Sequence, residues 1–325
     1  MNTEPLRIVF MGCPDFAIPS LKILSEDPEF KIVAVYCMPD RPKGRGKKPS
    51  PTPVKTFATE HDYVVQTPAT FRNAPAEIEA LKAFSPDYIV VVAYGLILPQ
   101  AILDIPRIAA INLHASILPE FRGPSPIHQA ILAGKSKTGN TVMLMSKGMD
   151  EGDILSVAEM PINDSDDFAA LHDRLSTSGA ILLAQTLKDY ATGNIQATPQ
   201  QHDKATYTSK ITPQTARINW NMPATVVNNL IRAMSPFPGA WFEDDNERIK
   251  VFKALTVVDP HQDLPPGSVL SQDLNEGICV ECGQSTVIKL LELQRAGKSR
   301  LVCADFLRGC KLKSAHLTSE TNHNV

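Results

Sequence analysis

Short apolar runs alternate with helical segments through the first half of the chain, and this alternation limits the possible folds most. The segments expected to be strands are Leu6–Met11, Lys31–Cys37, Asp87–Ala93 and Ile108–His114. Helical spacing is found between them at Phe16–Leu24 and Pro75–Phe84. Strands that are apolar along their whole length are typical of parallel sheets covered by helices on both faces. The pattern therefore predicts a doubly wound α/β domain with a mostly parallel sheet, which binds ligands at the carboxyl ends of its strands.

One more strand and a long helix complete this predicted domain. The strand is expected at Asn140–Met145. The helix is amphipathic, with Ser165 expected as its N-cap and with Asp166 and Asp167 in its first turn. Gly193 is expected to mark its end, because glycine readily takes the left-handed conformation that terminates helices.

The pattern changes after the long helix. Residues 194–206 are polar and contain Pro199, which indicates a linker. A helix at Ala224–Met234 and short strands between Asp, Pro and Gly turns then predict a small β-rich barrel. These strands are expected at Arg248–Phe252, Gly267–Leu270, Gly277–Glu281 and Ile288–Leu293. The predicted organisation is a domain at 1–193, a linker at 194–206, a second domain at 207–313 and a polar, disordered tail at 314–325.

Composition narrows the class of protein. A chain of 325 residues is long enough for two domains, and its net charge of −3 argues against a dedicated nucleic-acid-binding protein. No apolar run approaches the length of about 20 residues that a membrane helix needs, and no signal segment is expected. Six cysteines are scattered without a disulfide framework, so a cytoplasmic protein is predicted. Cys279 and Cys282 form a C-x-x-C motif without a second zinc-type pair, and Gly283 after it indicates a structural hairpin.

A polar pair stands at the end of the fourth predicted strand. Asn112 and His114 are two residues apart, so their side chains point to the same face. Histidine carries protons near neutral pH, and the asparagine amide can donate to an oxyanion. Polar groups in an apolar strand are costly without partners. The pair is therefore either part of a catalytic site or a satisfied core histidine beside a turn-capping asparagine.

A glycine-flanked acidic loop, Lys147–Asp153, follows the next predicted strand. A carboxylate from Asp150 or Asp153 would be able to orient His114 and to stabilise its charge, as a general acid/base histidine requires. The same residues are also ordinary turn formers, so a purely structural loop is the alternative.

A basic segment follows the second predicted strand, on the same sheet edge. Between Arg41 and Lys55 there are six basic residues and no acidic one, and Pro and Gly indicate an exposed loop without regular structure. A solvated surface run is one interpretation; a phosphate or RNA partner is the other, since concentrated like charges attract polyanions. Between Lys289 and Lys313, seven further basic residues stand against two acidic ones, which favours a nucleic acid that contacts both domains.

Several large enzyme classes are disfavoured. The first predicted strand continues as Gly12–Phe16, without the Gly-x-Gly-x-x-Gly of dinucleotide-binding proteins. The sequence contains neither a Walker loop nor a zinc-type histidine cluster. Nicotinamide dehydrogenases, P-loop enzymes and zinc hydrolases are therefore not expected, and no metal is predicted.

The motifs taken together resemble the formyltransferases that use 10-formyltetrahydrofolate. The central motif is Asn112-x-His114, then Ser116-Ile117-Leu118-Pro119-x-x-Arg122-Gly123, then Asp150. Further motifs are similar to the members of this family that act on methionyl-tRNA: Met11–Ala17, Pro39–Lys48, Val90–Gly95, Ala216–Trp220 and Pro236–Trp241. The resemblance covers about residues 5–312.

The resemblance implies a Rossmann-like catalytic domain and an OB-like β-barrel. A monomer without membrane contact is expected from the sequence itself, which has no obvious dimerisation helix and no membrane-length apolar run. The implied reaction is direct formyl transfer, through a tetrahedral intermediate, from 10-formyltetrahydrofolate to the α-amine of methionyl initiator tRNA for translation initiation. The implied catalytic residues are Asn112, His114 and Asp150. The implied folate-binding residues are Ser116, Ile117, Leu118, Pro119, Val91, Val92, Ala93 and Tyr94. The implied tRNA-binding residues are Arg41, Lys43, Arg45, Lys47 and Lys48.

Other activities predict different sequence features. A formyltransferase acting on glycinamide ribonucleotide would end near residue 200, and one acting on an amino sugar would not need the basic segment. A deformylase that sends the formyl group to water would share the same site, so only its product separates it. A non-catalytic RNA-binding protein would not need Asn112, His114 and Asp150.

Overall fold

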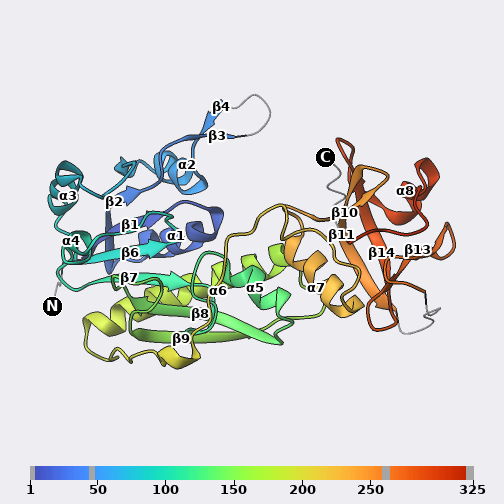
Figure 1. Cartoon of the computed structure of the whole chain (residues 1–325). Helices are drawn as coiled ribbons and strands as arrows, with labels where there is room; N and C mark the ends of the chain where they lie inside the picture. Colours follow the sequence, from blue (N-terminus) through green and yellow to red (C-terminus); the bar gives the residue numbers. More distant parts are fainter. Residues whose placement is uncertain (1–3, 44–47, 258–263, 320–325) are drawn as a thin grey trace. The chain divides into compact units, whose positions relative to one another are not determined.

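The computed structural model describes residues 4–43, 48–257 and 264–319, which form two compact units (Figure 1). The first unit comprises Met1–Pro126, Lys137–Pro161 and His172–Thr208, and the second comprises Ile127–Ser136, Ile162–Leu171 and Ser209–Val325. Two short segments that the sequence analysis placed in the first domain, 127–136 and 162–171, therefore group with the second unit.

A seven-stranded sheet in the order β5-β2-β1-β6-β7-β8-β9 forms the first unit. Its strands are β1 (Leu6–Gly12), β2 (Phe30–Tyr36), β5 (Val65–Gln66), β6 (Tyr88–Val92), β7 (Ala109–His114), β8 (Lys137–Leu144) and β9 (Ile154–Pro161). The strands from β5 to β7 pair in parallel, whereas β8 and β9 add to β7 as antiparallel strands. The predicted mostly parallel, doubly wound sheet is confirmed.

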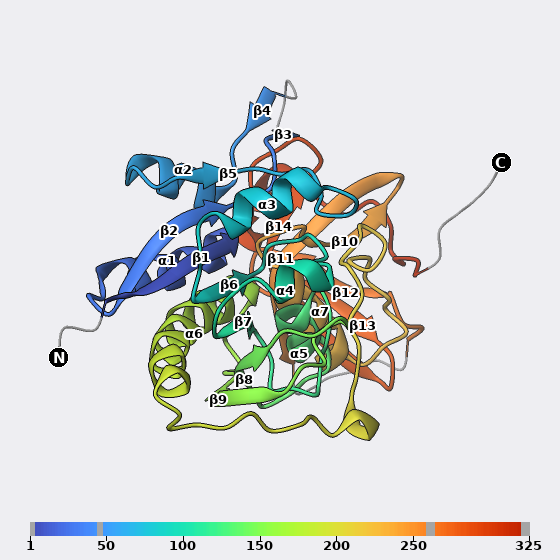
Figure 2. The ribbon, with the colours of Figure 1, turned by 90° about the vertical axis from the view of Figure 1, so that its left-hand side faces the viewer.

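Helices cover both faces of this sheet, as Figure 2 shows for α3 and α4 on one side and α6 on the other. The helices of the first unit are η1 (Asp15–Ala17), α1 (Ile18–Glu26), α2 (Pro53–Glu60), α3 (Pro75–Lys82), α4 (Gln100–Leu103), most of α6 (Phe168–Ala191) and η2 (His202–Lys204). Ile89 of β6 packs in a core cluster with Leu81 of α3 and Ile102 of α4. Tyr88 points to the opposite face, where its hydroxyl donates to the Leu187 carbonyl of α6 at 2.9 Å.

Helix α6 begins at Phe168, later than the predicted cap at Ser165 allows. The carboxylate of Asp166 turns back and accepts a hydrogen bond from Asn163 N at 2.7 Å, which holds the preceding turn. Asp167 Oδ1 then accepts from Ala170 N at 2.9 Å, the usual N-cap contact. The predicted cap at Ser165 is therefore wrong, and Asp167 takes that place.

The basic segment contains a short hairpin, so the prediction that it has no regular structure is wrong. Strand β3 (Arg41–Lys43) pairs in antiparallel fashion with β4 (Lys48–Ser50), and residues 44–47 lie outside the described chain. Pro42 faces Pro49. Facing residues of an antiparallel pair alternate between hydrogen-bonded and non-bonded positions, so two opposed prolines can share a position that needs no N–H donor.

An antiparallel sheet in the order β10-β11-β14-β13-β12, with β15 paired to β14, forms the second unit. Its strands are β10 (Ala240–Asp244), β11 (Glu247–Val257), β12 (Val269–Asp273), β13 (Gly277–Cys282), β14 (Thr286–Arg295) and β15 (Leu301–Val302). Its helices are α5 (Pro126–Leu132), α7 (Ala224–Met234) and α8 (Cys303–Gly309). The β-rich second half is confirmed, and so is the β13–β14 hairpin after the C-x-x-C motif. Closure into an OB-like barrel stays a prediction.

Two segments that were expected to be loosely held are hydrogen-bonded instead. In the predicted linker 194–206, Thr198 exchanges two backbone hydrogen bonds with Ile154, both at 2.8 Å. In the predicted tail, Leu317 is 1% exposed and donates to the Gly267 carbonyl. The part of the tail at 314–319 is thus packed against β12, because Leu317 supplies an apolar anchor in a polar stretch; residues 320–325 lie outside the described chain.

The hydroxyl of Tyr88 gives a test of how α6 is attached to the sheet. Tyr88→Phe leaves the buried Leu187 carbonyl without its donor, which should lower the free energy of unfolding by about 1–3 kcal/mol. Urea unfolding followed by circular dichroism measures the change. The matched control is Tyr63→Phe, at a partly exposed position, with an expected change within about 0.5 kcal/mol. Equal losses in the two variants would contradict the assigned contact.

Candidate active site

Asn112 and His114 lie on the same face of β7, at its carboxyl end. Only 8% of Asn112 and 6% of His114 is exposed. Asn112 faces Met143 and His114 faces Thr141 on the antiparallel neighbour β8. The Asn112 amide makes no hydrogen bond with any residue in the described part of the chain, and it is not among the side-chain atoms there that are closed off from solvent. The amide is therefore available to a ligand.

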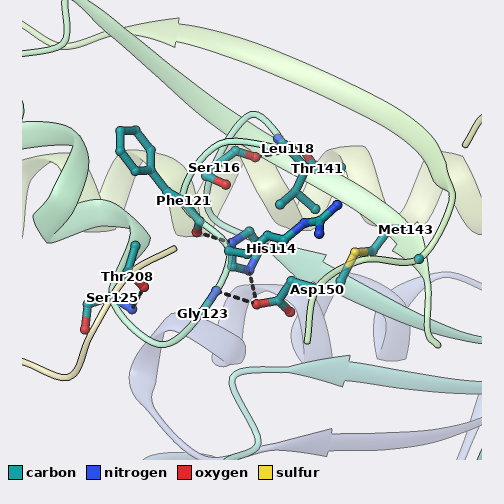
Figure 3. A network of polar contacts seen from close by, with 12 residues as sticks. His114, Ser116, Leu118, Phe121, Gly123, Ser125, Thr141, Met143, Asp150 and Thr208 are labelled. Atoms are coloured by element: carbon teal, nitrogen blue, oxygen red, sulfur yellow. Dashed lines mark hydrogen bonds and ion pairs between the residues drawn. The ribbon is translucent and has the colours of Figure 1, made fainter. Parts of the chain in front are cut away.

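The His114 ring lies between a backbone carbonyl and a carboxylate (Figure 3). Its Nε2 is 2.9 Å from the Phe121 carbonyl, and because a carbonyl only accepts, Nε2 carries a proton. Its Nδ1 is 3.7 Å from Asp150 Oδ2, within ion-pair range but too long for a hydrogen bond. The Phe121 carbonyl thus orients the ring, and any second proton, on Nδ1, would face the carboxylate.

The Asp150 carboxylate is bound by a neighbouring turn, and the Asp150 backbone adopts an unusual conformation. Its Oδ2 accepts a hydrogen bond from Gly123 N at 2.7 Å. Its φ of 52° lies in the left-handed region, which is rare for a residue with a Cβ and persists where surrounding contacts enforce it. Phe121, which orients His114, also has a positive φ of 62°. Two strained residues therefore flank the imidazole.

The geometry separates Asp150 from Asp153, which the loop sequence alone did not. Asp153 is one of the residues around an open cavity of about 440 Å³ beside the same loop, and its backbone carbonyl accepts from Leu144 N at 2.9 Å. The residues that line this cavity are Leu144, Met145, Ser146, Glu151, Gly152, Asp153 and His202. Of the two aspartates, it is Asp150 that forms the ion pair with His114.

The residues predicted to bind folate fall into two groups by burial. Side chains within the protein interior are Ser116, Leu118, Val91, Val92 and Tyr94. Ile117 and Pro119 are half-buried, and Ala93 is exposed with a φ of 49°. The Ser116–Pro119 segment, with a cis Leu118–Pro119 bond, is fixed by Thr141, whose hydroxyl donates to Ser116 O at 2.7 Å. This segment can therefore offer side-chain contacts at Ile117 and Pro119, and only backbone contacts at its buried positions.

Arg41 is exposed in the basic hairpin, as its predicted role with tRNA requires. The side chains of Lys43, Arg45, Lys47 and Lys48 lie outside the described residues. Lys55, which follows the hairpin on α2, forms an ion pair with Asp40 at 2.7 Å.

Cys13, at the end of β1, is not placed to act as a nucleophile. Its Sγ donates to the Tyr94 carbonyl at 3.0 Å and accepts from Met38 N at 3.3 Å. Burial raises the pKa of the Cys13 thiol, and burial raises the pKa of neighbouring Cys37 to about 12. Since the thiolate is the reactive form, both sulfurs stay protonated and inert at neutral pH.

Two residues outside the predicted site hold it together. Arg122 is 1% exposed, and its guanidinium donates to Gln200 Oε1 through Nε at 3.1 Å and Nη2 at 2.7 Å. Gln200 lies in the predicted linker, where polar composition gave no sign of burial. Arg122 belongs to the Ser116–Gly123 motif, which by itself indicated no role for it.

Neither a metal-type cluster nor a membrane-length apolar helix is found among the described residues. No group of three or more His, Cys, Asp or Glu side chains there is arranged to hold a metal ion. Within the same residues, no helix has the length and apolar character of a membrane span.

Known proteins resemble the chain along most of its length. Residues 6–187 match the family model described as formyl transferase, and residues 210–311 match that of the formyl transferase C-terminal domain. A methionyl-tRNA formyltransferase of Geobacillus thermodenitrificans is 45% identical over 303 residues, 93% of this chain and 94% of the relative. One of Clostridium novyi is 42% identical over 304 residues, 94% of this chain and 97% of the relative.

Solved structures show the same fold at lower identity. WlaRD, a sugar 3N-formyl transferase, superimposes with a TM-score of 0.64 at 17% identity, over 91% of this chain and 100% of that one. HypX from Aquifex aeolicus, in complex with tetrahydrofolic acid, gives a TM-score of 0.59 at 16% identity, over 94% of this chain and 47% of that one. With two family models matched in order and relatives above 40% identity, the chain belongs to the formyl transferase family.

Proposed function

We propose that this protein transfers a formyl group from 10-formyltetrahydrofolate to the α-amine of methionyl initiator tRNA. The observation that carries the proposal is the His114–Asp150 pair beside the unpaired Asn112 amide. It lies at the carboxyl end of β7, in a chain 45% identical over 303 residues to a methionyl-tRNA formyltransferase.

The hydrogen-bond donor at Asn112 suits a bound formyl group. Asn112 is nearly buried and has an N–H that no described residue uses, so it can donate to the formyl oxygen as negative charge develops there. When bound, 10-formyltetrahydrofolate supplies the formyl group. The Ser116–Pro119 segment and the backbone at Val91–Tyr94 would hold the folate on this side of the sheet.

His114 is suited to take the proton that the attacking amine loses. Its Nε2 is committed to the Phe121 carbonyl, so Nδ1 is the atom that can accept that proton. The positive charge then formed on the ring faces the Asp150 carboxylate at 3.7 Å, which stabilises it. Asn112 and the charged ring together would stabilise the oxyanion. His114 can then return its proton to N10 of the folate as the bond between N10 and the formyl carbon breaks, so that tetrahydrofolate leaves without any covalent bond to the protein.

The second unit and the basic hairpin are proposed to bind the tRNA. Arg41 is exposed, and residues 41–48 carry five cations in a net acidic chain. Such a local excess of positive charge is an electrostatic site for phosphates. We assign the acceptor end to the hairpin and the tRNA body to the second unit, in a monomeric protein.

Substitution of the pair tests the chemical assignment. His114→Ala and Asp150→Asn should each lower kcat by about 10²–10⁴-fold, because a general acid/base and its charge partner are lost. The assay is formation of formylmethionyl-tRNA from labelled 10-formyltetrahydrofolate. His61→Ala, an exposed histidine at the end of α2, is the control and should keep the wild-type rate. Near-normal turnover in both site variants would rule the assignment out.

Salt dependence tests the basic segment. For each phosphate contact removed by Arg41→Gln or Arg45→Gln, the slope of log affinity against log salt should flatten by about 0.7–0.9. Filter binding of methionyl initiator tRNA at several salt concentrations gives the slope. Lys31→Gln, at an exposed position of β2, should leave it unchanged. Identical slopes for wild type and both arginine variants would exclude phosphate contacts by this segment.

A further inference from the structure

Every hydrogen-bonding position of the Gln200 amide is used. The side chain is 5% exposed, and its Nε2 donates to the carbonyls of Asp150 at 2.9 Å and of Gly152 at 2.7 Å. Its Oε1 accepts two hydrogen bonds from Arg122, at 3.1 and 2.7 Å. A glutamine amide has two donors and two acceptor positions, so this one is fully satisfied. One side chain therefore connects the acidic loop to the turn at Arg122.

The loop that carries Asp150 is closely packed where Gln200 binds it. A Cβ added at Gly152 would lie 1.8 Å from the Leu144 carbonyl, so the backbone passes directly against β8 at this point. Asp150 itself adopts a positive φ of 52°. A strained conformation of this kind is kept only by contacts from outside the loop, and the Gln200 amide supplies two of them.

Arg122 stands between the two backbone groups that contact the catalytic pair. The residue before it, Phe121, orients His114 through its carbonyl, and the residue after it, Gly123, donates to Asp150. The Arg122 backbone is fixed by Thr206 and Thr208, through hydrogen bonds of 2.9 and 2.8 Å. A shift of this turn would therefore move the partners of both His114 and Asp150 at once.

We propose that Gln200 is a positioning residue for formyl transfer: it couples the Asp150 loop to the Phe121–Gly123 turn, so that the carboxylate stays opposite His114 Nδ1. Gln200 acts through Asp150 and does not touch either substrate. The inference rests on the proposed roles of His114 and Asp150. Misplacement of a catalytic group by about 1 Å can lower a rate about 10²-fold, so loss of this coupling should be measurable.

Gln200→Glu removes the hydrogen bonds that the amide nitrogen donates and keeps those that the oxygen accepts. The carboxylate still accepts from Arg122, which preserves the buried contact, but it cannot donate to the Asp150 and Gly152 carbonyls. We expect kcat to fall about 10²-fold while KM for both substrates changes less than about 3-fold. The matched control is Gln201→Ala, the exposed neighbour, which should keep wild-type kinetics. A Gln200→Glu protein that folds and keeps wild-type kcat overturns the proposal.

Combination with Asp150→Asn distinguishes positioning from general support of the fold. If Gln200 acts through Asp150, the double variant should be no slower than Asp150→Asn alone, and the pH–rate profile of Gln200→Glu should shift in the same direction as that of Asp150→Asn. Rate losses that multiply would show that Gln200 acts independently of Asp150 and would overturn the proposal.

The same measurements distinguish a failure of the role proposed for Gln200 from a failure of the role proposed for Asp150. Full activity of Asp150→Asn would remove the assigned role of Asp150 itself, whereas a slow Asp150→Asn with a normal Gln200→Glu would overturn only the positioning role. Thermal unfolding checks that each variant folds. If Gln200→Glu does not fold, Gln200→Met takes its place, since it keeps the length of the side chain and removes both sets of hydrogen bonds. Wild-type kcat in a folded Gln200→Met protein would contradict the proposal.

Discussion

Two backbone groups of one turn fix the relative positions of His114 and Asp150. The Phe121 carbonyl binds His114 Nε2, and Gly123 N binds the Asp150 carboxylate. The first contact requires a proton on Nε2, and Nδ1 is the ring atom that faces Asp150. The turn is itself paired with the Thr206–Thr208 segment, so a stretch of chain far along in the sequence determines the geometry of the imidazole. If this turn moved, His114 and Asp150 would separate.

The sheet brings the other components to the same place. Parallel pairing places the end of β7 beside the end of β6, which is where an open α/β sheet binds ligands. Strand β8 then runs antiparallel to β7, and β9 runs antiparallel to β8. The loop between β8 and β9 carries Asp150. The proposed catalytic residues thus come from a strand end and an adjacent hairpin loop, while Gln200 and Arg122 connect the loop to the turn.

Local patterns predicted the parts of the site that depend on short-range geometry. Strand alternation was enough to place Asn112 and His114 on one face. Asp150 and Asp153 were indistinguishable from the loop sequence, because the backbone conformation that directs Asp150 toward His114 depends on contacts from distant residues. Gln200 was assigned to a linker because its neighbours are polar; its buried amide is bound by Arg122, 78 positions away in the chain. Likewise, the N-cap of α6 depends on which of several neighbouring polar residues binds the first turn. The Pro42–Pro49 pair depends on the register in which β3 and β4 pair.

The most direct measurement compares acceptors. The purified protein is incubated with 10-formyltetrahydrofolate and either methionyl initiator tRNA or free methionine, and formylmethionine and formate are quantified. We expect formylmethionine on the tRNA, a far slower reaction with free methionine and little formate release to water. Equal rates with both acceptors, or formate as the main product, would contradict it.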